Sequence, residues 1–363
     1  MIVIGTITQA LLYLCFAILT GNFLLYLVPK NHRPDINVPK GVLMIAIGGI
    51  AIFSFIPVLQ LILYLSPDIG FAQTLKFVLY TFEVGKAWIF TYILSTLLFI
   101  FVIWFDFRKR PLYAYIGIAF TLLLILALGW SSHASSIDQV WGFISHSTHF
   151  TAVSVWVGIL FVVSWFTKNH SNWLYFLRWF TPVAIVCLLI TVGSGFILMT
   201  FVLDLKEYAN TWMLPYGQAL LFKHLLIIPL LVCAFLNSIL IRKKLTNNQN
   251  FNPKPWTKVE SIVILLIFSA TAALGQQSPP HETAISSSVV SKLFTAFYQG
   301  QFQPNMTVQF MVNVNSLILI VLALLLLLLT IMSFVKKVSP VLSFLLSVLF
   351  VFSSYLALMI SIQ

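Results

Sequence analysis

Ten apolar runs, each about as long as a bilayer is thick, dominate this chain. A helix needs about 20 consecutive apolar residues to cross a bilayer, and it satisfies its backbone polar groups internally. The predicted spans are Ile2–Val28, Gly41–Leu65, Glu83–Phe105, Leu112–Trp130, Trp141–Phe166, Leu174–Leu203, Pro215–Ile241, Val259–Leu274, Val314–Phe334 and Val338–Ile362. The sequence therefore predicts an all-α, polytopic transmembrane helical bundle of about ten spans.

Composition and motifs narrow the class of protein further. Only 8% of the 363 residues are charged, whereas soluble domains carry about 25%, so a soluble fold is excluded. The three cysteines lie in apolar runs without close spacing, so neither a disulfide framework nor a zinc ribbon is predicted. Because the sequence contains no nucleophile elbow, P-loop or HExxH motif, we do not expect an enzyme.

Loop charges predict how the spans are oriented. Most of the 20 lysine and arginine residues fall in alternate loops, beginning with the loop after the first span. Loops rich in Lys and Arg face the cytoplasm, so both termini are expected outside. The net charge of +11 is spread thinly over these inner loops. This charge indicates which loops face the cytoplasm, and no nucleic-acid partner is expected.

The span Trp141–Phe166 carries two histidines, His146 and His149, which share one face of a helix because they are three residues apart. Ionisable groups inside a span are costly and usually mark a functional site. Three further histidines are predicted on the same, outward side: His133, His224 and His281. Given the rise of 1.5 Å per residue, His149 and His224 are expected at similar depth.

The outward histidines predict a metal site. Imidazole suits copper, zinc, nickel and iron, whereas carboxylates suit magnesium, calcium and manganese. Thioethers beside imidazoles favour copper, above all Cu(I). The methionines near the same side are Met199, Met213, Met306 and Met311. All five outward histidines are therefore candidate ligands of an outward-facing site for a soft or borderline metal.

Other interpretations of these rings stay open. A single histidine in a span also serves as an interhelical hydrogen-bonding group, and His281 follows a Pro-Pro turn that is compatible with a plain surface position. Haem iron takes axial imidazoles. Ligation of haem by His149 and His224 together would indicate a haem-binding or cytochrome oxidase assembly membrane protein.

Lys223 lies beside His224 within a predicted span. An ammonium at this depth requires a partner or a water-filled pocket, unless its side chain reaches the headgroups. Glu83, Asp204 and Glu207 are candidate partners on the predicted outer side. Lys223 and Glu83 are therefore expected to support the metal site.

Three segments resemble a known family. They are HFTAVSVWVGIL, with His149, Trp156 and Gly158; PYGQALLFKHLLIIPLLVCAFLN, with Tyr216, Gly217, Lys223 and Asn237; and SSHA, with His133. Together they are similar to the copper resistance protein D (CopD) domain family of bacterial inner-membrane proteins. The resemblance extends from about Leu112 to Pro280.

The resemblance implies copper handling at the cytoplasmic (inner) membrane, with copper uptake as the function and with Trp156 and Tyr216 supporting the site. It divides the chain into N-terminal transmembrane helices (1–111), a CopD-like core (112–280), and an outer loop with a C-terminal helix pair (281–363). No β-type copper domain fused to the spans is recognisable. A separate extracellular copper-binding protein is therefore the expected partner, beside copper ion and the lipid bilayer.

Overall fold

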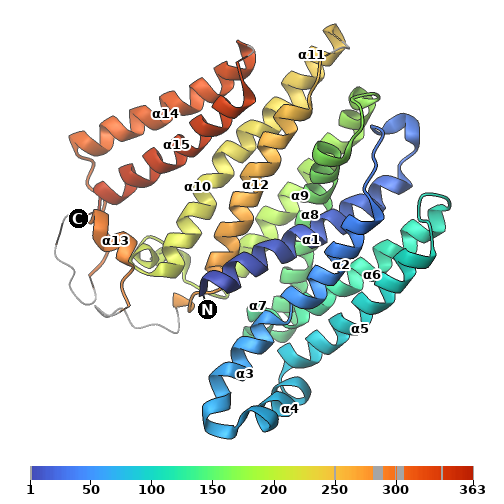
Figure 1. The fold of residues 1–363 in the computed structure, drawn as a ribbon. Helices are drawn as coiled ribbons and strands as arrows, with labels where there is room; N and C mark the ends of the chain where they lie inside the picture. Colours follow the sequence, from blue (N-terminus) through green and yellow to red (C-terminus); the bar gives the residue numbers. More distant parts are fainter. Residues whose placement is uncertain are drawn as a thin grey trace. The chain divides into compact units, whose positions relative to one another are not determined.

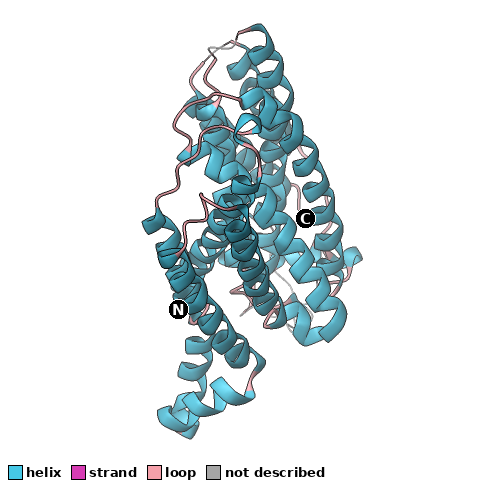
Figure 2. Ribbon diagram, turned by 90° about the vertical axis from the view of Figure 1, so that its right-hand side faces the viewer, coloured by secondary structure: helices cyan, strands magenta, loops and turns pink. Residues whose placement is uncertain are grey.

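The computed structural model describes residues 2–248, 251–280, 289–298, 300, 306–336 and 338–362. These residues form helices joined by loops, with no strand among them (Figures 1 and 2). The chain divides into two compact units, Met1–Phe201 and Val202–Gln363. The predicted division into 1–111, 112–280 and 281–363 follows the family resemblance and stays a prediction.

The first unit consists of nine α-helices and one short 3-10 helix within its described residues. They are α1 (Ile2–Leu27), η1 (Lys30–His32), α2 (Lys40–Phe53), α3 (Ile56–Ile69), α4 (Phe71–Thr81), α5 (Glu83–Trp104), α6 (Pro111–Trp130), α7 (His133–Ile137), α8 (Gln139–Phe166) and α9 (Trp173–Thr200). The longest of them run through the unit side by side in Figure 1, and the short α7 leads directly into α8.

The second unit is also helical wherever it is described. Its elements are η2 (Leu205–Glu207), η3 (Asn210–Met213), α10 (Pro215–Phe235), the π-helical segment η4 (Leu236–Leu240), α11 (Ile241–Asn247), α12 (Lys254–Leu274), α13 (Lys292–Phe297), α14 (Val314–Val335) and α15 (Pro340–Ile360). Here α10 packs along α12, and α14 packs along α15.

Ten helical segments in the described ranges are long and apolar enough to cross a membrane, which confirms the predicted fold class. The second span is longer than predicted, Lys40–Ile69, and a turn at Ser54 and Phe55 divides it into α2 and α3. The eighth starts at Lys254 rather than Val259, because Pro255 in its first turn needs no hydrogen-bond acceptor for its nitrogen. The orientation of the termini stays a prediction.

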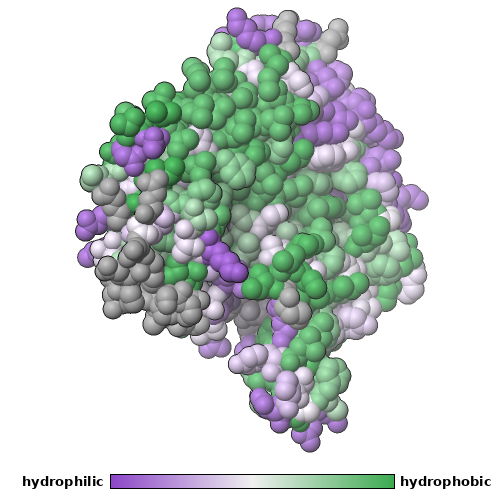
Figure 3. Space-filling view, turned by 60° about the vertical axis from the view of Figure 1, so that its left-hand side comes forward, coloured by the Kyte–Doolittle hydropathy of each residue, from purple (hydrophilic) through white to green (hydrophobic). Residues whose placement is uncertain are grey.

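Hydrophobic side chains cover much of the molecular face that Figure 3 shows. On α14, Val314 is 73% exposed and Leu324 is 62% exposed. Soluble proteins rarely expose continuous apolar surface of this kind, whereas a helix in a bilayer turns such residues to lipid. The surface therefore agrees with a multi-pass membrane protein.

A close contact between α1 and α8 forms the centre of the first unit. Gly21 and Gly158 face each other there, and a Cβ atom built on Gly158 would overlap the carbonyl oxygen of Ala17. Phe16, which precedes Gly21 on α1, packs edge-on against Phe150, which precedes Gly158 on α8, with ring centroids 5.2 Å apart. Small residues allow two helix backbones to approach closely where no hydrophobic effect drives association.

The beginning of α8 is fixed by its neighbours. The Asp138 carboxylate accepts hydrogen bonds from the backbone N–H groups of Val140 (3.1 Å) and Trp141 (2.9 Å), which satisfies two donors that the helix leaves unpaired. Gly142 allows α7 to lie directly against α8, since a Cβ atom there would overlap the Ala134 carbonyl. Together these contacts fix the beginning of α8, and so the positions of His146 and His149, which lie one and two turns after Gly142.

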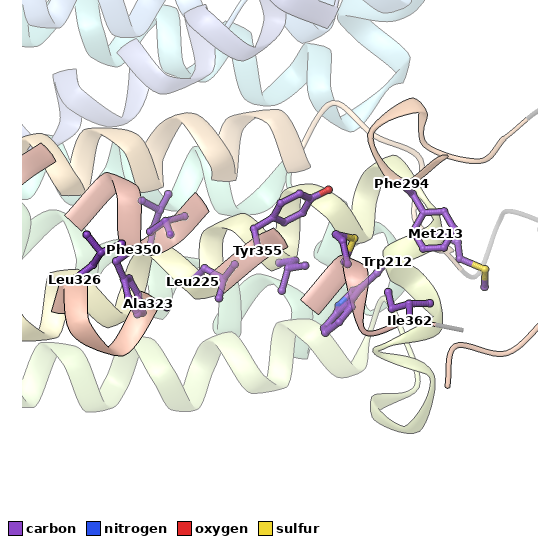
Figure 4. Packing of buried hydrophobic residues seen from close by; sticks show 13 residues of the cluster. Trp212, Met213, Leu225, Phe294, Ala323, Leu326, Phe350, Tyr355 and Ile362 are labelled. Carbon is purple, nitrogen blue, oxygen red and sulfur yellow. The ribbon is translucent and has the colours of Figure 1, made fainter. Parts of the chain in front are cut away.

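A hydrophobic cluster holds the second unit together (Figure 4). The Tyr355 ring of α15 stacks on Phe222 of α10 at 4.5 Å, and its hydroxyl donates a hydrogen bond of 2.7 Å to Gln218. Phe294 of α13 is fully buried in the same cluster, next to Met213. The described part of the segment between α12 and α14 is therefore anchored to the core of this unit.

The contact between α1 and α8 predicts a selective effect of adding one methyl group. Gly158→Ala should destabilise the protein by about 1–3 kcal/mol, because overpacking forces the two backbones apart. Gly48→Ala is the matched control, since a Cβ atom on Gly48 meets open space. The measurement is the temperature at which half of the purified protein is lost from the monodisperse peak. Equal midpoint temperatures for the two variants would contradict a close contact between α1 and α8 at Gly158.

Candidate metal-binding histidines

The first unit places His146 and His149 on α8, where both rings are half-buried. Their spacing puts them on one face of the helix, with Cβ atoms about 5–6 Å apart. Their contacts differ. The His149 ring bonds Ser194 on α9, whereas the His146 ring stacks on Phe150 of its own helix, α8. The two imidazoles are therefore positioned by different means.

The hydrogen bond of His149 determines its tautomer. Its Nδ1 lies 3.1 Å from the Ser194 hydroxyl oxygen. Ser194 donates its single hydrogen to the backbone carbonyl of Ile190, at 2.5 Å, so it can only accept from the imidazole. A neutral His149 therefore carries its proton on Nδ1 and its lone pair on Nε2. Metal-ligating histidines have this arrangement, with the second nitrogen donating to a neighbouring group.

Gly195 leaves room for the His149 ring beside α9. A Cβ atom on Gly195 would lie 3.3 Å from Cε1 and 3.5 Å from Nδ1 of His149. Any larger side chain at position 195 would therefore press on the ring. Gly193, two residues earlier, faces open space and has no such role.

His146 has a buried nitrogen without a partner. Its ring stacks on Phe150, with centroids 6.3 Å apart and an interplanar angle of 23°, and Phe150 packs in turn on Tyr13 and Phe16 of α1. Within the described part of the chain, Nδ1 is buried and forms no hydrogen bond. A buried nitrogen left unpaired costs about 1–3 kcal/mol, and such an atom points to an unseen water or ion.

Two further candidate histidines of the outward side remain. His133 is the first residue of the five-residue helix α7 and is exposed. His281 lies outside the described residues. Their predicted ligand roles stay predictions.

His224 belongs to the second unit and has its own partner. Its Nδ1 lies 2.7 Å from the hydroxyl of Tyr208, which packs edge-on against Trp212. Burial raises the pKa of the Tyr208 hydroxyl, so this group stays protonated where an exposed tyrosine would ionise. Because a tyrosine hydroxyl can donate or accept, this bond alone does not fix the tautomer of His224.

The predicted supporting residues occupy different environments. Glu83 forms an exposed ion pair with Lys86 at 3.0 Å, and Trp156 is buried on α8 two turns beyond His149. In the second unit, Lys223 and Tyr216 are half-buried on α10.

The candidate counterions of Lys223 within its own unit bond to other groups. The Asp204 carboxylate accepts from the Lys206 backbone N–H, and the Glu207 carboxylate accepts from the Asn210 amide. No ion pair with Lys223 is found among the described residues.

A larger ligand cluster is not found in the described ranges, where no three His, Cys, Asp or Glu side chains are grouped to hold a metal ion. Met213 is fully buried in the apolar cluster of the second unit, and Met359 contacts the Gln218 amide through its sulfur at 3.6 Å. These two methionines therefore fill the core. Of the four methionines singled out in the sequence, Met213 therefore packs in the core, and the roles of Met199, Met306 and Met311 stay predictions.

Two partner residues were not predicted. Ser194 and Tyr208 each bond a candidate histidine, yet a serine in an apolar span and a tyrosine in a loop carry no distinctive sequence signal. The pairing depends on which helix faces align, and a single sequence does not contain that information.

Residues 174–274 match the family model for copper resistance protein D. The match runs from the beginning of α9 to the end of α12, and it includes Tyr216, Lys223 and His224. The resemblance seen in the sequence is confirmed for this segment, whereas His133, His146 and His149 precede it. No curated protein and no solved structure matches the chain. The chain is thus a multi-pass membrane protein with a segment similar to copper resistance protein D.

The two histidine hydrogen bonds predict selective NMR changes. Ser194→Ala should alter the ring-nitrogen resonances of His149 and leave those of His224 unchanged, because it removes the acceptor that fixes the Nδ1–H tautomer. Tyr208→Phe should do the reverse, so each variant is the control for the other. The measurement is histidine-selective nitrogen NMR of the purified protein. If Ser194→Ala left the His149 signals in place, the assigned tautomer would be wrong.

Proposed function

We propose that this protein binds copper at the outer side of the cytoplasmic membrane and carries it inward, with copper as cargo rather than as a resident cofactor. The match of residues 174–274 to copper resistance protein D and the ten long apolar helices of the described chain support this function. The proposal assigns binding and transport to the protein and no catalysed reaction.

The proposal is carried by the His146–His149 pair. The His146 ring has a buried Nδ1 without a partner among the described residues, and the His149 ring holds its lone pair on Nε2 through the bond to Ser194. Burying an imidazole nitrogen with nothing to bind is unfavourable, whereas a soft or borderline metal would satisfy it. In this proposal, His146 and His149 are the first copper ligands.

Two imidazoles from one helix leave coordination positions for other donors. In the described part of the chain no third His, Cys, Asp or Glu side chain completes the group. An incomplete site suits transfer, because a metal that passes between proteins exchanges ligands one at a time. A separate extracellular copper-binding protein would supply the remaining donors until the ion is released to the pair.

His224 is the second ligand position of the proposal. It lies in the segment related to copper resistance, next to Lys223 and bonded to Tyr208. Its role would be to receive copper after the His146–His149 pair. The alternative function is haem binding, with His149 and His224 as axial ligands. Haem binding predicts a coloured protein preparation with a Soret band, whereas the copper proposal predicts a colourless preparation.

Copper binding tests the proposed ligands directly. Replacing His146 and His149 together by Ala should reduce the copper bound per protein and weaken Cu(I) affinity, because two donors are lost. His170→Ala is the control, since His170 lies in the loop between α8 and α9. The measurement is metal analysis with a competing Cu(I) chelator on protein purified in detergent. Unchanged stoichiometry and affinity in the double variant would remove the site, and a Soret band would favour haem.

The residue that orients His149 gives a second, more sensitive test. Ser194→Ala should weaken Cu(I) binding about 10–100-fold, which is the usual effect of losing a group that orients a metal ligand. Ser164→Ala is a matched control, because Ser164 on α8 is also buried and bonds the carbonyl four residues earlier, at 2.7 Å. Equal affinities for the two variants would show that Ser194 does not position a ligand.

A further inference from the structure

A buried polar contact lies in the second unit, between η4 and α12. Glu260, in the second turn of α12, is only 3% exposed. Its Oε2 accepts a hydrogen bond of 2.5 Å from the amide of Asn237, which is itself 5% exposed. A buried carboxyl group in a membrane helix is expensive and is a functional candidate by default.

The backbone conformation after α10 places Asn237 next to Glu260. The α-helix α10 ends at Phe235, and the chain then forms the π-helical segment η4, Leu236–Leu240, before α11 begins. A π-helical turn inserts an extra residue and rotates the side chains that follow, and such turns occur frequently at functional sites. Asn237 lies in this turn, and its amide also approaches the Trp256 carbonyl of α12 at 3.4 Å.

The Glu260–Asn237 contact leaves one hydrogen-bond acceptor of Asn237 unused among the described residues. Within the described residues the Oδ1 atom of Asn237 is buried and accepts no hydrogen bond. The arrangement therefore consists of a carboxyl group, one amide donor to it, and one unsatisfied amide acceptor. Glutamine at position 260 would offer hydrogen bonds of its own without the penalty of a buried charge. What a carboxyl group has and an amide lacks is a proton that it can release.

The surrounding titratable and charged groups are few and are located at this end of the unit. On α10, Cys233 is buried and interacts electrostatically with the Glu260 carboxyl group. On α11, Lys244 lies over the Phe251 and Phe334 rings, at 4.3 Å and 4.8 Å. The other basic residues described at this end are Arg242 and Lys243 on α11, Lys254 and Lys258 on α12, and Lys336 after α14. On α15, which packs against α12, Ser343 is buried and does not titrate.

We propose that Glu260 is a proton-binding site, with Asn237 as the residue that positions its carboxyl group. The step is the reversible breaking of the carboxyl O–H bond, with the proton passing to water at the membrane surface nearest the start of α12. No electron is transferred. The Asn237 amide donates to the carboxylate, and its free Oδ1 is the acceptor available to the protonated carboxyl group.

Proton binding of this kind would couple metal movement to pH. This coupling rests on the proposed copper transport, whereas proton binding by Glu260 does not. The cytoplasmic side is the predicted location of the α12 start, because the loop before it is rich in lysine and arginine. Within the second unit, the proton would then bind and leave on the membrane side opposite His224, which lies towards the other end of α10.

Infrared difference spectroscopy of the full chain without copper tests the site. Between about pH 4 and pH 9, a range that brackets exposed and buried glutamates, the C=O band of a buried carboxyl group should appear on acidification. It should vanish in Glu260→Gln and persist in Asp68→Asn, since Asp68 is exposed in the first unit. A titrating band that survives Glu260→Gln, or no titrating band in the parent protein, overturns the proposal.

A second variant keeps the test decisive if Glu260→Gln does not fold. Asn237→Ala retains the carboxyl group and removes its partner, so the same band should persist at a shifted frequency. An unshifted band would show that Asn237 does not position Glu260. Because no copper is present, a negative result here leaves the copper proposal standing, and loss of the copper site would leave this result unaffected.

Discussion

Apolar helices packed in a bilayer offer a polar side chain few partners, and this constraint explains the polar contacts of this protein. In lipid, each polar group is satisfied by a neighbouring helix or by a bound ligand. His149 is satisfied by Ser194, His224 by Tyr208, and Glu260 by Asn237. His146 differs, because its buried Nδ1 has no partner in the described part of the chain. This unpaired nitrogen is the observation on which the proposed copper site rests.

Close helix packing makes these contacts precise enough to orient a side chain. The glycine contact between α1 and α8 brings the two backbones together, and Gly195 leaves room for the His149 ring beside α9. Ser194 can then fix the imidazole tautomer, because its hydrogen is already committed to the Ile190 carbonyl. A two-atom contact thus decides which nitrogen can bind a metal. Neither the helix nor the histidine alone would determine this.

The two units contain different chemistry. The first has the two histidines proposed as copper ligands on α8, and the second has His224 towards one end of α10 and the Glu260–Asn237 pair after its other end. Residues 174–274, which match copper resistance protein D, include α10 and α12 in full. A metal transporter requires binding groups for its cargo and, where transport is driven by protons, a group that titrates. The proposals assign these two tasks to separate sets of residues.

The sequence by itself determined the ten long apolar helices and the candidate histidines, because length and hydropathy decide what crosses a bilayer and ionisable groups stand out against an apolar background. It also carried the family resemblance. Only the tertiary structure showed that Ser194 and Tyr208 contact the histidines, and that Glu260 meets Asn237 in a π-helical turn. Such pairs join residues from 16 to 45 positions apart, and which helix faces meet depends on packing between helices. Hydrophobic periodicity within one helix does not record that packing.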